Sequence, residues 1–172
     1  GHQYAITLDY SNWVQAEAWA EEITVSGVKG HLVTINNAEE NAWLSNFIKD
    51  SYTRNNYSGP DYNSNIAWIG LEYVGGDRAD STSWNWVNGD PDPVEYWNPD
   101  HRGISGNTGD HMIMTGQNFY GSWGNPLMGE WSCNSVHDTD YNWNPKGIIE
   151  VPEPTTLLLL GLGGMFLRKH RT

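Results

Sequence analysis

The stretch Asn65-Ile66-Ala67-Trp68-Ile69-Gly70-Leu71 is the most apolar short run in the body of the chain. Its length and its content of Ile and Trp predict a buried central strand rather than a helix. Gly70 indicates a place where another backbone or a large ring approaches closely. Polar, glycine-rich sequence lies on both sides, so the neighbouring amphipathic segments need this strand as their shared core element.

Two amphipathic helices are predicted before this strand. The first begins after Ser11 or Asn12, either of which is a good cap, and runs to about Thr24. Its apolar stripe recurs at spacings of three and four and consists of Trp13, Ala16, Ala20 and Ile23. The second opens at a variant capping box formed by Asn37 and Glu40. Its predicted buried face consists of Trp43, Leu44, Phe47 and Ile48.

Short strands and long loops make up the rest of the body. The strands predicted before the central one are Gln3–Thr7 and His31–Ile35. Those predicted after it are Trp84–Val87, followed by a turn at Asn88-Gly89, then His111–Met114, Gly129–Cys133 and Gly147–Val151. The predicted loops are Lys49–Asn65, Glu72–Ser83 and Asp90–Asp110, the last long enough to indicate function. The predicted helices come early in the chain and most of the predicted strands come late. This order predicts an α+β fold.

Composition narrows the function classes. The 172 residues carry a formal net charge of -12, which excludes nucleic acid as an expected partner. There are 10 Trp and 9 Tyr but only 3 Phe, a balance typical of loop-rich cores and of sugar or protein contact surfaces. Cys133 is the one cysteine, so no intramolecular disulfide forms. We find no nucleophile, phosphate-loop or dinucleotide motif and predict that the protein is not an enzyme.

The C-terminal segment differs from the body and divides the chain into residues 1–150 and 151–172. Val151-Pro152-Glu153-Pro154 is followed by an apolar core from Leu157 to Leu167 and then by the basic Arg168-Lys169-His170-Arg171. The apolar core is well below the roughly 20 residues that cross a bilayer untilted. We interpret the segment as an address or anchor rather than as part of the fold.

Several motifs in order resemble the C-type lectin-like domain of secreted bacterial proteins, over about residues 3–150. They are Trp13–Ala20, Gly30–Ile35, Glu39–Leu44, Trp68–Leu71, Trp84–Gly89, Tyr96-Trp97 and Gly129–Trp131. The tail is similar to a PEP-CTERM sorting signal. That resemblance implies processing by an exosortase, transient membrane anchoring, and delivery to the bacterial envelope or extracellular matrix.

The lectin resemblance implies a double-loop fold, in which terminal strands pair and a long loop between Val74 and Asp110 carries the ligand site. In sugar-binding members a calcium ion there takes carboxylate, amide and sugar hydroxyl oxygens. The family's Glu-Pro-Asn triplet corresponds to Asn98-Pro99-Asp100 in this chain. Its Trp-Asn-Asp corresponds to Trp131-Ser132-Cys133, which lacks both the amide and the carboxylate and leaves Asn134 one position late.

The candidate residues follow from this correspondence. Those expected to bind ligand are Tyr96, Trp97, Asp100, Asp110 and Asn134. Those expected to bind calcium are Asp77, Asp80, Asp100, Asp110 and Asn134. Alternatives stay open at several of these positions: the two aromatic rings either stack on sugar or pack in the core, and the first two aspartates either bind metal or form a solvated acidic turn.

Three functions are weighed. The first is a cell-surface or extracellular carbohydrate-binding module, with calcium assistance, whose partner is a glycan or polysaccharide. The alternative is a structural or adhesive matrix protein that binds a protein partner without metal, which the altered Trp131-Ser132-Cys133 favours. A cysteine-dependent enzyme is the third, and the lone Cys133 argues against it.

Overall fold

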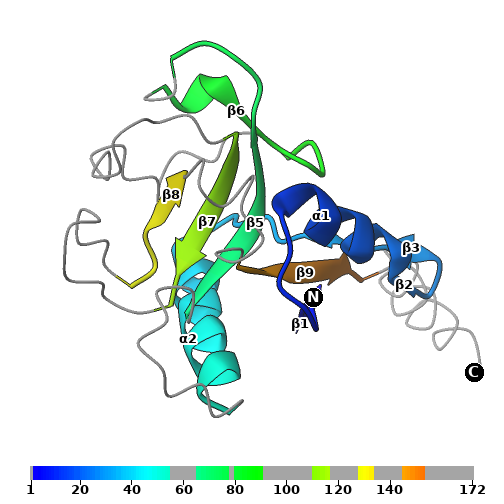
Figure 1. Cartoon of the computed structure of the whole chain (residues 1–172). Helices are drawn as coiled ribbons and strands as arrows, with labels where there is room; N and C mark the ends of the chain where they lie inside the picture. Colours follow the sequence, from blue (N-terminus) through cyan, green and yellow to red (C-terminus); the bar gives the residue numbers. More distant parts are fainter. Residues whose placement is uncertain are drawn as a thin grey trace, which may run out of the picture.

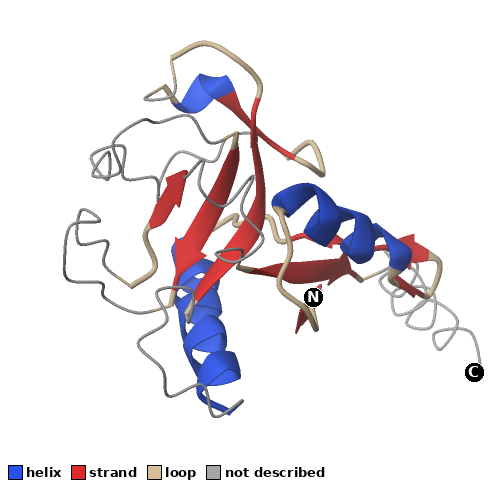
Figure 2. Ribbon diagram, in the orientation of Figure 1, coloured by secondary structure: helices blue, strands red, loops and turns tan. Residues whose placement is uncertain are grey.

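The computed structural model describes residues 2–54, 65–77, 80–90, 110–116, 128–133 and 145–153. Two α-helices and a set of short strands confirm the α+β class (Figure 2). In chain order the elements are β1 (His2–Ile6), α1 (Trp13–Glu22), β2 (Thr24–Val25), β3 (Val28–Lys29), β4 (His31–Leu32), α2 (Ala38–Arg54), β5 (Ile66–Tyr73), the 3₁₀ turn η1 (Ser81–Ser83), β6 (Trp84–Trp86), β7 (His111–Thr115), β8 (Trp131–Cys133) and β9 (Lys146–Pro152).

One seven-stranded sheet runs through the molecule in the order β1-β9-β5-β7-β8, with β4 on β9 and β6 on β5 (Figure 1). Strand β1 pairs antiparallel with β9, with His2 opposite Pro152, so the two ends of the domain meet at its base. The β5–β9 pairing is parallel, whereas the other pairs are antiparallel. The central strand therefore joins the terminal strands to the strands of the loop region.

Helix α1 forms where its apolar stripe predicts it and lies along β9 (Figure 1). Asn12 is the N-cap, and its side chain accepts a hydrogen bond from the Gln15 N–H at 2.9 Å. Trp13, Ala16 and Ala20 are buried as predicted. The prediction was wrong at Ile23, which is 36% exposed and caps the helix. The helix ends at Glu22, and a tight hairpin of β2 and β3 follows it. The sequence did not predict this hairpin.

Helix α2 begins at the predicted cap, where Asn37 Oδ1 accepts the Glu40 N–H at 2.9 Å. Its buried face carries Leu44 and Ile48 as predicted, together with Ser45. Trp43 is 49% exposed, so its predicted burial was wrong. At 100° per residue it lies beside the buried stripe, where its ring stacks on Phe47 at 5.1 Å.

The ends of two predicted elements differ between the sequence prediction and the structure. The predicted loop from Lys49 was wrong for its first residues, because α2 continues to Arg54. The predicted strand His31–Ile35 pairs as a strand only at His31–Leu32. The Val33 N–H bonds to the Ile148 carbonyl at 2.8 Å, and the Val33 carbonyl accepts the Gly70 N–H at 2.9 Å. This extended segment therefore bridges β9 and β5 instead of lengthening one ladder.

The predicted central strand is confirmed as β5, which is buried from Ile66 to Leu71. The indole N–H of Trp68 donates to the Ser11 carbonyl, and that of Trp13 donates to the Ile69 carbonyl, both at 2.8 Å. A Cβ at Gly70 would lie 2.4 Å from the Leu32 carbonyl oxygen, so the predicted close approach is of backbone. Four tryptophans belong to the core and are at most 3% exposed: Trp68, Trp84, Trp86 and Trp131.

Candidate functional site

The long loop region begins where β5 ends, and β6 returns along β5 toward its base (Figure 1). The Val74 N–H donates to the Ser83 carbonyl at 2.9 Å, and the Tyr73 hydroxyl donates to the Gly76 carbonyl at 2.6 Å. Gly75 and Gly76 have φ of 115° and 109°, which glycine adopts without strain. One backbone hydrogen bond and one from the Tyr73 hydroxyl to the backbone thus close the first described part of this loop on itself.

Asp110 lies beside the start of that loop. Its carbonyl accepts the Tyr73 N–H at 2.8 Å, immediately before β7 begins at His111. The residue is exposed, so its carboxylate has access to solvent. The structure therefore places Asp110 at the rim from which residues 74–90 depart, although these residues are distant in sequence.

A backbone hydrogen bond joins Asp77 and Asp80 in the loop that leaves this rim. The Asp77 carbonyl accepts the Asp80 N–H at 2.9 Å. The Asp80 Oδ1 atom accepts both the backbone N–H and the hydroxyl of Thr82, each at 2.9 Å. These bonds stabilise the charged form and lower the pKa of Asp80 below its ordinary value. Both aspartates are exposed, and the structure is consistent with the alternative of a solvated acidic turn.

The remaining predicted ligands lie outside the described residues: Tyr96, Trp97, Asp100 and Asn134. Calcium takes six to eight oxygen ligands. Within the described ranges, Asp77, Asp80 and Asp110 do not form a group of three carboxylates close enough to share an ion. The described part of the loop region does not by itself form a calcium site, and the residue assignments stay predictions.

Two hydrogen bonds of Asn41 and one contact between tryptophan rings hold together the elements beneath the loop region. The Trp131 indole N–H donates to Asn41 Oδ1 at 2.9 Å, and the Asn41 amide donates to the Gly129 carbonyl at 3.0 Å. Trp131 also packs edge-on against Trp86, with ring centroids 5.6 Å apart. Helix α2 and strands β6 and β8 are therefore fixed to one another below the loops.

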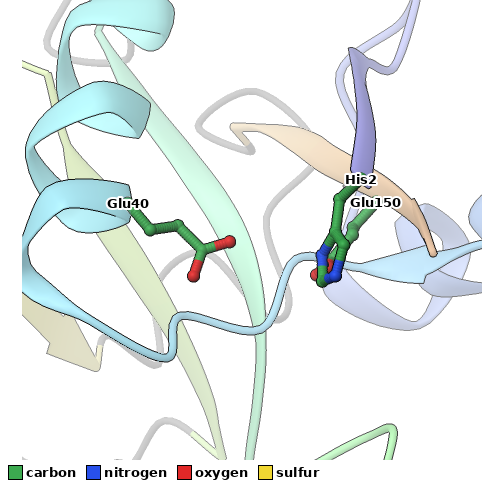
Figure 3. Close-up of side chains that lie close together, drawn as sticks. All are labelled: His2, Glu40 and Glu150. Atoms are coloured by element: carbon green, nitrogen blue, oxygen red, sulfur yellow. The ribbon is translucent and has the colours of Figure 1, made fainter. Parts of the chain in front are cut away.

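A second polar group gathers at the base of the domain. His2 on β1, Glu40 on α2 and Glu150 on β9 each offer a ligand atom, and these atoms lie within 4.8 Å of one another. Figure 3 shows Glu40 pointing from the first turn of α2 toward the adjacent His2 and Glu150. In the part of the chain that the structure describes, no other group of three or more His, Cys, Asp or Glu side chains meets this criterion.

Burial is the largest influence on the pKa values of Glu150 and Tyr4 at this position. Glu150 is 1% exposed, and this burial raises its pKa, against which the Thr34 N–H and the His2 ring act in the opposite direction. Its Oε2 accepts the Thr34 N–H at 2.9 Å, and its Oε1 contacts His2 Nδ1. Glu40 accepts the Tyr4 hydroxyl at 2.6 Å and the Asn36 N–H at 2.9 Å. Burial, followed by this bond to Glu40, raises the pKa of Tyr4.

Sequence reasoning missed this group because its members are far apart in the chain. One signal was present: Glu150 interrupts the apolar strand Ile148-Ile149-Glu150-Val151, where a charge is costly unless it is paired. Nothing in the sequence named its partners, since only the β1–β9 pairing and the packing of α2 bring them together.

Comparison with known families gives the assignment. The family profile described as "Lectin C-type domain" matches residues 10–146, which is most of the chain. The chain belongs to the C-type lectin domain family. The lectin-like resemblance of the sequence is thereby confirmed, and so is the α+β fold that it implied.

Individual relatives agree with the family assignment. This C-type lectin domain is 26% identical over 97 residues to one chain of the snaclec coagulation factor IX/factor X-binding protein of Echis carinatus. The match covers 56% of this chain and 66% of the relative, so it spans slightly less than two thirds of that relative's length. The curated relative therefore supports the family rather than a particular activity.

Solved structures show the same fold. The C-type lectin CEL-I from Cucumaria echinata aligns with a TM-score of 0.59 and 19% identity, covering 89% of this chain and 91% of that one. The cow C-type carbohydrate-recognition domain of CD23, solved in the presence of an oligosaccharide, aligns with a TM-score of 0.51 and 19% identity, covering 87% and 86%. At this identity the likeness concerns the fold alone.

The tail is assigned in the same way. A profile described as "PEP-CTERM protein-sorting motif" matches residues 150–171. This confirms the interpretation of the tail as a sorting signal, which indicates delivery through the cell envelope with a C-terminal membrane-anchoring segment. Among the described residues, no helix has the length and apolar character needed to cross a membrane.

Proposed function

We propose that this protein is a carbohydrate-binding module of the cell surface or extracellular matrix, assisted by calcium, with the ligand held by the loops between Val74 and Asn134. The observation that carries the proposal is membership of the C-type lectin domain family over residues 10–146. The cow relative was solved in the presence of an oligosaccharide, which supports a glycan as the partner class. The proposal is of binding rather than of catalysis.

The geometry of the rim supports this location. Asp110 is exposed at the point where residues 74–90 leave β5, and Asp77 lies in the same loop. We propose that Asp77, Asp80, Asp100, Asp110 and Asn134 supply oxygen ligands to calcium, and that Tyr96 and Trp97 stack on the apolar face of a sugar ring.

The sorting motif supports the cellular setting. We propose that an exosortase-type enzyme processes the tail and that the anchoring is transient. Residues 1–150 would then act as the binding domain and residues 151–172 as the signal that brings it to the envelope.

A glycan array followed by calorimetric titration of the full chain, with calcium and with a chelator, tests the proposal. Trp97→Ala is expected to abolish sugar binding, whereas Trp43→Ala, which removes an exposed tryptophan on α2, leaves it unchanged. Asp110→Asn is expected to remove the calcium-dependent part of the affinity, and Asp50→Asn on the exposed side of α2 is its control. Absence of glycan binding in both conditions would overturn the proposal.

A metal-free adhesive role is the second candidate. It is favoured by Trp131-Ser132-Cys133, which stands where sugar-binding relatives carry an amide and a carboxylate. In that case calcium leaves the melting temperature unchanged, because only an ion that binds the native state stabilises it.

A further inference from the structure

We propose that the base of the domain rests on a lipid bilayer while the tail anchors the chain, with the rings of Tyr4, Trp43 and Phe47 in contact with zwitterionic headgroups. These three side chains are called the aromatic row below. Two observations carry the inference: the row lies where the tail leaves the fold, and very little chain separates the fold from the apolar run. The inference rests on the assignment of the tail as a membrane-anchoring sorting signal and is independent of glycan binding.

The aromatic row is continuous and partly open to solvent. The Tyr4 ring on β1 lies 5.0 Å from that of Trp43 on α2, which stacks on Phe47 at 5.1 Å. Trp43 is 49% exposed, and the other two rings are half-buried. Within the residues that the structure describes, the Trp43 indole N–H has no hydrogen-bond partner, whereas the hydroxyl of Tyr4 donates to Glu40. A ring with an apolar body and a free polar edge favours the interface between lipid and water.

The row begins beside the point where the tail leaves the fold. Strand β9 ends at Pro152, the first residue of Pro152-Glu153-Pro154 in the sorting motif. His2 stands opposite Pro152 in the β1–β9 ladder, and its ring lies 6.2 Å from that of Tyr4. Figure 3 shows α2 facing this end of β1, with Glu40 pointing toward His2. The row therefore extends from the exit of the tail onto helix α2.

The length of chain after β9 keeps this face close to the membrane. Four residues, 153–156, separate Pro152 from the start of the apolar run at Leu157, a reach of at most about 18 Å. The headgroup layer on each side of a bilayer is about 5–8 Å thick, so Pro152 stands at most about 13 Å outside it. A domain of about 150 residues has a radius of gyration of about 15 Å. Because the gap is smaller than the domain, the domain cannot turn this end away from the membrane.

The apolar run itself shortens the gap. Residues 157–167 number 11, against the roughly 20 that cross a bilayer untilted. A short apolar stretch is accommodated by thinning of the bilayer or by drawing its flanking residues toward the interface. The basic residues after the run favour the far side of the membrane and hold that end in place. Both responses bring Pro152, and with it the aromatic row, toward the headgroups.

Charge around the row selects the lipid. Glu39 and Asp50 are exposed, and they lie on the same side of α2 as Trp43, four residues before it and seven after it. The whole chain carries a formal net charge of -12. An anionic headgroup is repelled by these carboxylates, whereas the ammonium group of a zwitterionic headgroup is attracted to them. The surface that fits this face is therefore a bilayer of zwitterionic lipid.

The experiment uses the full chain with its tail, inserted into phosphatidylcholine vesicles. Tryptophan fluorescence is compared with and without lipid that is brominated near the headgroup end of its acyl chains, since bromine quenches a neighbouring indole. Trp43→Phe is expected to remove most of this quenching. Trp19→Phe, which replaces a half-buried tryptophan on α1, is the matched control and should leave the quenching unchanged. Unfolding in urea checks that both variants fold.

Lipid composition tests the role of charge. Replacing part of the unbrominated phosphatidylcholine with phosphatidylglycerol is expected to reduce the quenching of the unmodified chain, because the anionic lipid repels the carboxylates beside the row. Glu39→Gln should recover part of that loss. Glu21→Gln, exposed on α1, is its control and should recover none of it.

Four results would overturn the inference. The first two are quenching that Trp43→Phe leaves unchanged and quenching that Trp19→Phe reduces as much. The third is protection of Trp43 from an aqueous quencher that rises with the ratio of protein to lipid without any quenching by brominated lipid, which would assign the row to a second copy of the chain. The fourth is failure of the full chain to enter vesicles, which would overturn the anchoring as well. None of them bears on the glycan proposal, since the sugar experiments use residues of the loop region.

Discussion

Gly70 provides the sharpest test of how the fold is built, through the substitution Gly70→Ala. A Cβ at this position would lie 2.4 Å from the Leu32 carbonyl oxygen and 2.8 Å from Val87 Cγ2. The first distance is about 1 Å short of ordinary contact. The Leu32 carbonyl belongs to a backbone segment that is hydrogen-bonded on both sides, so it cannot easily move away.

The expected cost follows from these contacts. Forcing a methyl group into a packed core costs about 1–3 kcal/mol. The Gly70 N–H bond to Val33 and the Val87 N–H bond to Gly70 are both 2.9 Å, and displacing one of them adds about 1 kcal/mol. Alanine recovers about 0.4–1 kcal/mol by restricting the unfolded chain. The net expectation is a loss of about 3 kcal/mol, a large part of the 5–15 kcal/mol typical of a domain.

Equilibrium unfolding in urea, followed by tryptophan fluorescence, measures this loss. In thermal melting it corresponds to a fall of about 6–12 °C for a chain of this size. The control is Gly27→Asn in the β2–β3 turn, where φ is 84° and a Cβ would meet nothing within 4 Å. Asparagine tolerates that conformation, so this variant should lose less than about 1 kcal/mol. If Gly70→Ala is no more damaging than Gly27→Asn, the account of the close approach is wrong.

Three further substitutions test the cap, the scaffold and the buried carboxylate. Asn12→Ala removes the acceptor for the Gln15 N–H and should cost about 1 kcal/mol in urea unfolding. Trp131→Phe leaves Asn41 Oδ1 without its indole donor and should cost about 1–3 kcal/mol, with a smaller loss when Asn41 is already alanine. Burial raises the pKa of Glu150 above its ordinary value of 4.5, so the native state binds the proton more tightly and unfolding free energy falls as pH rises through that range. Glu150→Gln should lose this slope in metal-free urea titrations run across pH, and an unchanged slope would contradict the assignment.

Local sequence was enough to predict the elements that satisfy their needs within a few residues. A cap at Ser11 or Asn12, the Asn37 cap, the apolar stripe that begins at Trp13 and the apolar run of β5 were predicted from residue type, spacing and length; the structure confirms them and selects Asn12. Each depends on hydrogen bonds or burial that recur at the helical or strand period, which a sequence displays directly. The order of these motifs also predicted the family.

Predictions failed where a neighbour in space decided the outcome. Trp43 satisfies a helical stripe, but it lies at the edge of the buried face, where its ring packs on Tyr4 and Phe47 and remains 49% exposed. The segment Val33–Ile35 has strand composition, but its hydrogen bonds go to two different strands. Periodicity carries no information about which element lies opposite.

The sequence by itself therefore determined the fold class, the central strand and the sorting tail, whereas the residues expected to bind ligand stay predictions. Only the tertiary structure decided that His2, Glu40 and Glu150 meet, because the pairing of β1 with β9 and the docking of α2 join positions 38 to 148 residues apart. The tertiary structure also explains why position 70 is a glycine. The glycine expected to admit a close approach admits the Leu32 carbonyl, and so allows the terminal sheet to reach the strand from which the loops depart.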